Sequence, residues 1–103
     1  MESEAPEEEE QPSWTVVYTN KAEKSIPRLP EPVKIKLFAL VREMTLLGPV
    51  RGSWPGYSKI HTCSHHCQLK EGQPTYVCFW LVEDTELKII EVYYAGTHEK
   101  APY

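Results

Sequence analysis

The sequence predicts a single α+β domain in which a helical hairpin packs on one face of a small, mainly antiparallel sheet. Three observations lead to this class: a short β-branched and aromatic run at residues 14–19, two helical patterns between residues 21 and 47, and three strand-like runs after residue 58. Strands this close together in sequence pair as an antiparallel meander. The resulting order, β-α-α-β-β-β, suits a sheet with helices on one face. A chain of 103 residues has room for one such domain.

The first half of the chain contains the opening strand and both helices. Asn20 and Glu23 have the spacing of a capping box, so a short helix is expected from residue 21 to about Pro27, where proline removes a backbone donor. A second helix begins near Pro32 and ends before residues 48–49, a Gly-Pro pair. Its apolar stripe should face the core, with polar residues opposite. The stripe comprises Val33, Leu37, Leu40, Val41 and Met44, and the opposing residues are Lys34, Arg42 and Glu43.

The second half begins with a Gly- and Pro-containing loop at residues 50–57 and continues as three strands. We expect these strands at about residues 59–70, 75–83 and 86–95, with turns at 71–74 and 83–85. If Lys70 pairs with Thr75 across the first turn, His66 and Gln68 lie on the solvated face of the sheet, together with Lys70. Val77 and Phe79 then share that outer face as exposed apolar residues.

The charge of the chain is divided unevenly. The formal net charge is −4, but residues 1–13 hold six acids and no base, whereas residues 14–103 hold nine acids and eleven Lys and Arg. We therefore expect a disordered acidic tail at 1–13, which solubilises the chain or competes with phosphate for its basic surface, and a folded domain at 14–103. No apolar run reaches the roughly 18 residues of a transmembrane helix, and the acidic start is unlike a secretory signal. Three cysteines favour a reducing, cytoplasmic location.

Residues 63–67, Cys-Ser-His-His-Cys, suggest a metal site at first sight. On a strand, however, Cys63, His65 and Cys67 point to one face, and the predicted pairing places Cys67 opposite Cys78 and His65 opposite Trp80. That face is the one expected to meet the helices, and buried cysteine usually serves as a small apolar residue. The pattern favours core packing over a metal site. The two paired cysteines would form a disulfide only under oxidising conditions.

The order of elements and two motifs resemble the RelE/ParE superfamily of bacterial toxins, over residues 14–103. One motif is the loop Ser53-Trp54-Pro55-Gly56-Tyr57, and the other is the final segment Gly96-Thr97-His98-Glu99-Lys100-Ala101-Pro102-Tyr103. The resemblance to RelE implies a ribosome-dependent mRNA endonuclease that represses translation without a metal or cofactor. In that reaction a ribose 2′-OH attacks the adjacent phosphate. It also implies a cognate antitoxin, the ribosome and mRNA as partners, in the cytoplasm.

Matched position by position, the resemblance implies His98, Tyr103 and His66 as catalytic residues. It further implies RNA or phosphate contacts at Lys70, Lys100, Gln68 and Lys59. Histidine suits the acid and base steps, because its ordinary pKa lies near neutrality. Val77 and Gln68 stand where the family has cations.

Two alternatives follow from these departures. A ParE-like toxin would inhibit gyrase by binding rather than by cleavage, and a catalytically inactive interaction module would keep the fold alone. The modest positive charge of residues 14–103 is compatible with the inactive module, because contact with RNA usually requires a denser basic surface.

Overall fold

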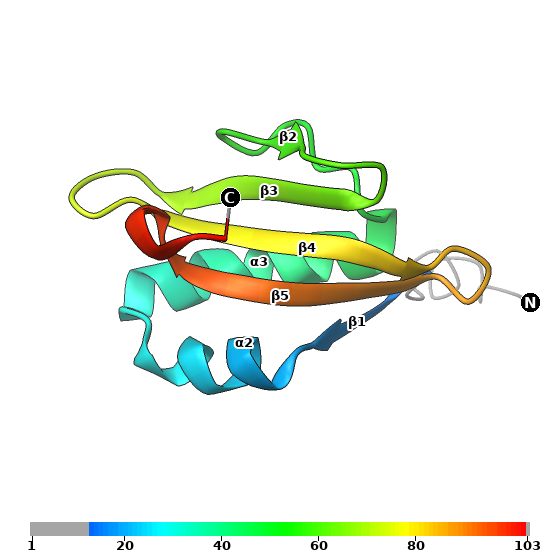
Figure 1. Ribbon diagram of the computed structural model, residues 1–103, viewed down its shortest axis with the longest axis horizontal. Coiled ribbons are helices and arrows are strands. Elements are labelled where there is room, and N and C mark those ends of the chain that lie inside the picture. The colour runs from blue at the N-terminus through cyan, green and yellow to red at the C-terminus, as the bar shows by residue number, and fades with distance from the viewer. Residues whose placement is uncertain (1–12, 103) are drawn as a thin grey trace, which may run out of the picture.

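The computed structural model describes residues 13–102, and in this range the predicted β-α-α-β-β-β order is confirmed, with one short strand added (Figure 1). The strands are β1 (Thr15–Tyr18), β2 (Ser58–Lys59), β3 (Ser64–Lys70), β4 (Tyr76–Asp84) and β5 (Ile89–Thr97). The helices are α2 (Asn20–Ser25) and α3 (Glu31–Leu47), with short 3₁₀ turns η1 (Ile26–Arg28) and η2 (His98–Lys100). The predicted acidic segment at 1–13 lies outside the described residues, apart from Ser13.

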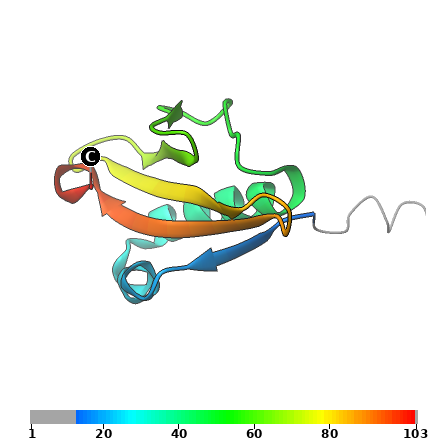
Figure 2. The same cartoon turned by 45° about the vertical axis from the view of Figure 1, so that its right-hand side comes forward.

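The strands form one sheet in the order β1-β5-β4-β3-β2, in which β1 runs parallel to β5 and the other pairs are antiparallel. The prediction of one strand over residues 59–70 is wrong in its first half. The chain turns at residues 60–63, and Lys59 pairs back onto His65. Hydrogen bonds from the Ile60 and His61 amides to the Ser64 carbonyl close this turn. Figure 2 shows β2 and its loop standing at the edge of the sheet beside β3.

Local interactions explain the start of α2 and the end of α3. Thr19, rather than the predicted Asn20, caps α2: its extended backbone precedes the helix, and its hydroxyl accepts a hydrogen bond from the Ala22 amide at 3.1 Å. The helix α3 ends at Gly48, whose φ of 98° is a conformation that other residues rarely adopt. The predicted positions of the two helices along the chain are therefore confirmed, with the first cap one residue earlier.

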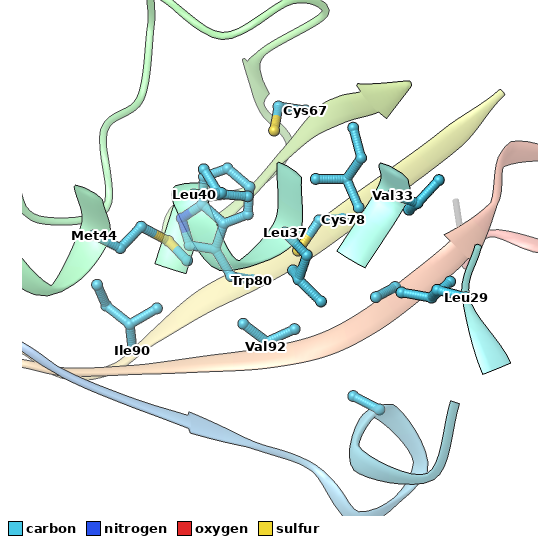
Figure 3. Packing of buried hydrophobic residues seen from close by; sticks show 13 residues of the cluster. Leu29, Val33, Leu37, Leu40, Met44, Cys67, Cys78, Trp80, Ile90 and Val92 are labelled. Carbon is cyan, nitrogen blue, oxygen red and sulfur yellow. The ribbon is translucent and has the colours of Figure 1, made fainter. Parts of the chain in front are cut away.

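The core lies between α3 and the inner face of β3, β4 and β5. Figure 3 shows Leu37 and Leu40 of α3 close to Trp80, and all three side chains are fully buried. The predicted inward stripe of α3 is confirmed, except that Val41 is only partly buried. Cys67 and Cys78 are paired across β3 and β4, as expected, and both are fully buried. The cysteine-containing face of β3 is thus the face that meets the helices.

Two features of the strands differ from their predicted positions. In β3 the register shifts between Gln68 and Lys70, so Lys70 pairs with Tyr76 and not with Thr75. The last strand begins at Ile89, three residues later than expected, because residues 85–88 form the preceding turn. The described residues include no helix long and apolar enough to cross a membrane.

Candidate functional site

The outer face of the sheet, meaning the face of β3, β4 and β5 turned away from α3, is not the solvated surface that alternation predicts. A register shift between Phe79 and Trp80 makes a bulge in β5, so the consecutive residues Tyr93 and Tyr94 both lie on this face. Their rings meet Phe79 edge-on, at centroid distances of 5.9 and 5.8 Å. Phe79 is consequently 0% exposed and Val77 2%, so the prediction of exposed apolar residues here is wrong.

Tyr94 also holds the chain where it leaves the sheet. Its hydroxyl donates a hydrogen bond to the Thr97 carbonyl at 2.6 Å, and to reach it the side chain passes close over Gly96. A Cβ at Gly96 would lie 2.8 Å from the tyrosine oxygen, so only glycine leaves room for this path. The amide of His98 then donates to the Thr75 carbonyl at 2.8 Å. These contacts fix η2 beside the turn between β3 and β4.

A cavity of about 530 Å³ opens between η2 and that turn. It is lined by Gln68, Gly72, Gln73, Pro74, Thr75, His98 and Glu99. The structure therefore brings together two predicted site residues, Gln68 and His98, that are thirty positions apart in sequence. The volume falls in the range of small-molecule and cofactor sites. The described lining has amide, hydroxyl, imidazole and carboxylate groups but no Lys or Arg, which suits a base or ribose better than a phosphate.

His66 lies on the same face, two residues along β3 from Gln68. It pairs with Phe79, and the two rings are tilted with centroids 5.0 Å apart. This packing leaves the imidazole half-buried in the middle of the outer face. Two residues before His66 in β3, the hydroxyl of Ser64 shares a hydrogen bond of 2.6 Å with the hydroxyl of Tyr93 in β5. His66 therefore has a defined position next to the Gln68 strand segment, although it does not line the cavity.

The three predicted lysines do not line the cavity, and Lys59 pairs with His65 of the inner face. Lys59, Lys70 and Lys100 are all exposed. Lys100 is in η2, while Lys59 is at the edge of the sheet in β2. Because of the β3 register shift, Lys70 lines a second cavity of about 270 Å³ instead. Tyr103 lies outside the described residues.

The loop between α3 and β3 supports the wall of the larger cavity. The Pro55 carbonyl accepts a hydrogen bond of 2.8 Å from the backbone amide of Gln68. Gly56 lies so close to the Gln68 side chain that a Cβ at Gly56 would be 2.8 Å from Gln68 Cγ. The loop is anchored to α3 by Glu43. This carboxylate accepts hydrogen bonds from the Trp54 indole at 2.8 Å and from Arg51 at 3.1 Å.

Sequence reasoning placed Glu43 on the solvated side of the helix, and this anchoring role was missed. A carboxylate next to a buried stripe, with an Arg and a Trp in the following loop, was the available signal. Tyr93 and Tyr94 were also missed as parts of the site. The available signal was the pair of adjacent aromatics, since regular alternation would turn one of them towards the core face and the other towards the outer face.

On the inner face, His65 and Cys67 of the apparent metal motif are used in packing, whereas Cys63 is exposed in the turn before β3, so its predicted place on the inner face is wrong. His65 is 3% exposed; it stacks on Trp80 at a centroid distance of 5.8 Å, and its Nδ1 lies 2.7 Å from the Tyr57 hydroxyl. Burial, with a smaller effect from Lys59, lowers the pKa of His65 below its usual value, which favours the neutral ring. Burial raises the pKa of the Cys67 thiol to about 12. No group of three or more His, Cys, Asp or Glu in residues 13–102 has an arrangement that could hold a metal ion.

Comparison with known proteins supports the fold through structure. No protein-family model matches the chain, and no curated protein matches it by sequence. Among solved structures, the isolated RelE toxin of E. coli is 18% identical, with 86% of this chain and 88% of that chain covered and a TM-score of 0.64.

Two complexes also match. The E. coli RelBE toxin–antitoxin complex is 17% identical, with 88% of this chain and 100% of that chain covered and a TM-score of 0.57. The archaeal RelE–RelB complex from Pyrococcus horikoshii is 11% identical, with coverage of 86% and 99% and a TM-score of 0.56. The predicted resemblance is thus confirmed at the level of structure: the chain has the RelE fold.

Proposed function

We propose that this chain is the toxin of a toxin–antitoxin pair and that it represses translation by cutting mRNA on the ribosome in the cytoplasm. The observation that carries the proposal is the meeting of Gln68 from β3 and His98 from η2 around one cavity large enough for a nucleotide. Two results of the structural comparison support the proposal. The chain has the RelE fold, and two of the similar structures are complexes of a toxin with its antitoxin.

The proposed chemistry requires proton transfer at two oxygens. The ribose 2′-oxygen forms a bond to the adjacent phosphorus as a base removes its proton, and the bond from phosphorus to the 5′-oxygen breaks as an acid protonates that oxygen. The products are a 2′,3′-cyclic phosphate and a 5′-hydroxyl. An imidazole can perform either transfer near neutral pH, and a well-placed acid or base contributes about 10²- to 10⁴-fold in rate.

We assign the general acid or base role first to His98, because it lines the cavity, and second to His66, two residues before Gln68 in β3. Tyr103 follows η2 by three residues, and we propose that it stacks on a base or transfers a proton. Lys100 would contact phosphate beside His98. Gln68 would hydrogen-bond the nucleotide within the cavity.

Lys59 and Lys70 would contact the RNA backbone on either side of that nucleotide. Both side chains are exposed at the β2–β3 edge of the sheet, so they are accessible to an extended strand. Contacts of this kind position RNA without reading its sequence.

One observation favours a second candidate, an interaction module of the same fold without catalysis. Val77 stands at a position where the family has arginine, and its side chain is 2% exposed beneath the outer face. No cation of the described residues lines the cavity to replace it. Cations around the phosphorane supply much of the transition-state stabilisation in such reactions, so their loss would leave binding without cleavage.

Primer-extension mapping of cellular mRNA after induced expression separates the two candidates. The first predicts new 5′ ends within translated codons, which disappear or fall by at least about 100-fold in His98→Ala. Deletion of Tyr103 should also reduce them. His61→Ala is the matched control, because this histidine is exposed in the turn before β3 and outside the cavity.

Two outcomes would contradict the nuclease proposal. Full cleavage by both His98→Ala and the Tyr103 deletion would show that the site is assigned wrongly. Growth arrest by the wild type with intact mRNA would favour the non-catalytic candidate. Circular dichroism and thermal unfolding of each purified variant establish that the changes act on the site and not on folding.

A further inference from the structure

The second cavity, of about 270 Å³, differs from the first in its charge. It is lined by Lys36, Pro55, Gln68, Leu69, Lys70 and Glu71. Lys36 comes from α3 and Lys70 from the end of β3, so two elements far apart in sequence each contribute a lysine to the lining of one hollow. Glu71 is the acid in the described lining, and the formal balance is therefore positive.

The register shift in β3 is what brings Lys70 to this hollow. With regular alternation Lys70 would share the outer face with Gln68 and His66. In the structure it pairs with Tyr76, whose side chain packs against the core, and it lines a cavity together with the helix residue Lys36. Buried Leu69 and the loop residue Pro55 complete this lining, so the two lysines flank a hollow with apolar parts.

Gln68 lines both cavities. In the larger cavity the described lining has no cation and is suited to a base or ribose. In the smaller cavity two lysines are suited to an anion. The linings of both hollows include residues of the β3–β4 turn, which lies at the same end of the sheet as the red η2 segment in Figure 1. A nucleic-acid strand has this same alternation, with a neutral nucleoside followed by an anionic phosphate.

We propose that the hollow between Lys36 and Lys70 binds a backbone phosphate of single-stranded RNA, and that the strand crosses Gln68 to place the neighbouring nucleoside in the larger cavity. The proposal rests on the proposed function and extends it by a route for the substrate and by Lys36 as a new contact. Lysine is a point charge with rotatable donors and binds phosphate without sequence preference.

The test measures binding without cleavage. A fluorescein-labelled, fully 2′-O-methylated RNA octamer cannot be cut by 2′-OH attack, and its dissociation constant is measured by anisotropy from 50 mM to 1 M KCl. Each single-strand phosphate contact adds about 0.7 to the slope of log affinity against log salt. Lys36→Ala and Lys70→Ala should each lower that slope by about 0.7. Over the twentyfold range of salt, this change in slope makes each variant bind about eightfold more weakly than the wild type at 50 mM KCl, while the two bind equally at 1 M KCl.

Lys88→Asn is the charge-matched control. Lys88 lies in the β4–β5 turn at the opposite end of the sheet, and asparagine tolerates its positive φ of 57°. An unchanged slope in this variant is expected. Equal losses in all three variants would indicate a general charge effect and overturn the assigned site.

The remaining outcomes separate this inference from the nuclease proposal. Failure of the wild type to bind the octamer, or unchanged slopes in Lys36→Ala and Lys70→Ala, would overturn the phosphate site whatever the cleavage mapping shows. The expected slopes with no mRNA cleavage would leave the site standing and refute the nuclease. Tighter, Lys36-dependent binding of a labelled octaglutamate peptide would assign the hollow to an acidic protein partner and also overturn the inference.

Discussion

Replacing Gly96 by alanine tests how the C-terminal segment is held. A Cβ at this position would lie 2.8 Å from the hydroxyl oxygen of Tyr94 and 3.0 Å from its Cζ, both closer than atoms normally approach. The tyrosine ring must therefore move, and its 2.6 Å hydrogen bond to the Thr97 carbonyl is lost. We expect Gly96→Ala to destabilise the protein and to release η2 from its place beside the cavity.

The size of the effect follows from three contributions. Loss of the Tyr94 hydrogen bond costs about 1 kcal/mol, and displacement of the packed ring costs about 2 kcal/mol. The alanine also reduces the conformational freedom of the unfolded chain, which raises the free energy of unfolding by about 0.5–1 kcal/mol and offsets part of this loss. The free energy of unfolding should fall by about 2 kcal/mol, which for a domain of this size lowers the melting temperature by roughly 8–16 °C.

Urea unfolding followed by tryptophan fluorescence measures this change, and a double-mutant cycle tests its cause. Tyr94→Phe alone should cost about 1 kcal/mol, the value of the hydrogen bond. Because that bond cannot be lost twice, Gly96→Ala should cost only about 1 kcal/mol in the Tyr94→Phe background. Gly52→Ala is the control: a Cβ at Gly52 meets no atom within 4 Å, and its effect should stay within about 0.5 kcal/mol.

Additive effects of the two substitutions, within about 0.3–0.5 kcal/mol, would refute the reasoning, since they would show that Gly96 and Tyr94 act independently. A Gly96→Ala protein as stable as the Gly52→Ala control would refute it as well.

Three further predictions concern the inner face. Because burial lowers the folded-state pKa of His65, the unfolded chain binds a proton more readily than the folded protein once the pH falls to about 6.5. The stabilisation should be fully present above the unfolded-state pKa of about 6.5 and be lost as the pH falls from there towards the lower folded-state pKa, and urea midpoints should fall less in His65→Gln. Burial raises the pKa values of Cys67 and Cys78, so a disulfide reagent at pH 7.5 should titrate only the exposed Cys63 in the folded protein and all three thiols in urea. Leu37→Ala, at a fully buried position, should lower the free energy of unfolding by about 2–5 kcal/mol, as measured by circular dichroism during denaturation.

The fold and the inner face could be predicted because each depends on a repeating pattern. The 3.6-residue period of Val33, Leu37, Leu40 and Met44 placed α3 on the sheet, and all four are buried. The two-residue period of the strands placed Cys67 opposite Cys78 and placed His65 and Cys67 in the core, whereas Cys63 is exposed because the strand begins only at Ser64. These periods follow from backbone geometry, which is the same wherever the element lies.

The outer face could not be predicted in the same way, because strand irregularities decide it. One extra residue in β5 turned Tyr93 and Tyr94 to the same side and buried Phe79, and a shift in β3 directed Lys70 away from Gln68. A bulge changes the face of every later residue on its strand, and its position depends on the partner strand. Prediction from alternation therefore fails beyond the first bulge.

The sequence by itself determined the class of the domain, the places of its helices and strands, and the residue types near its C-terminus, because local propensity and periodicity are properties of short segments. Only the tertiary structure decided which of those residues meet. His98 reaches Gln68 because Tyr94 and Gly96 direct the chain to the β3–β4 turn, and Lys36 reaches Lys70 because a bulge turns the strand end towards α3. Such meetings depend on contacts between distant segments, whose geometry is fixed only when the whole sheet has formed.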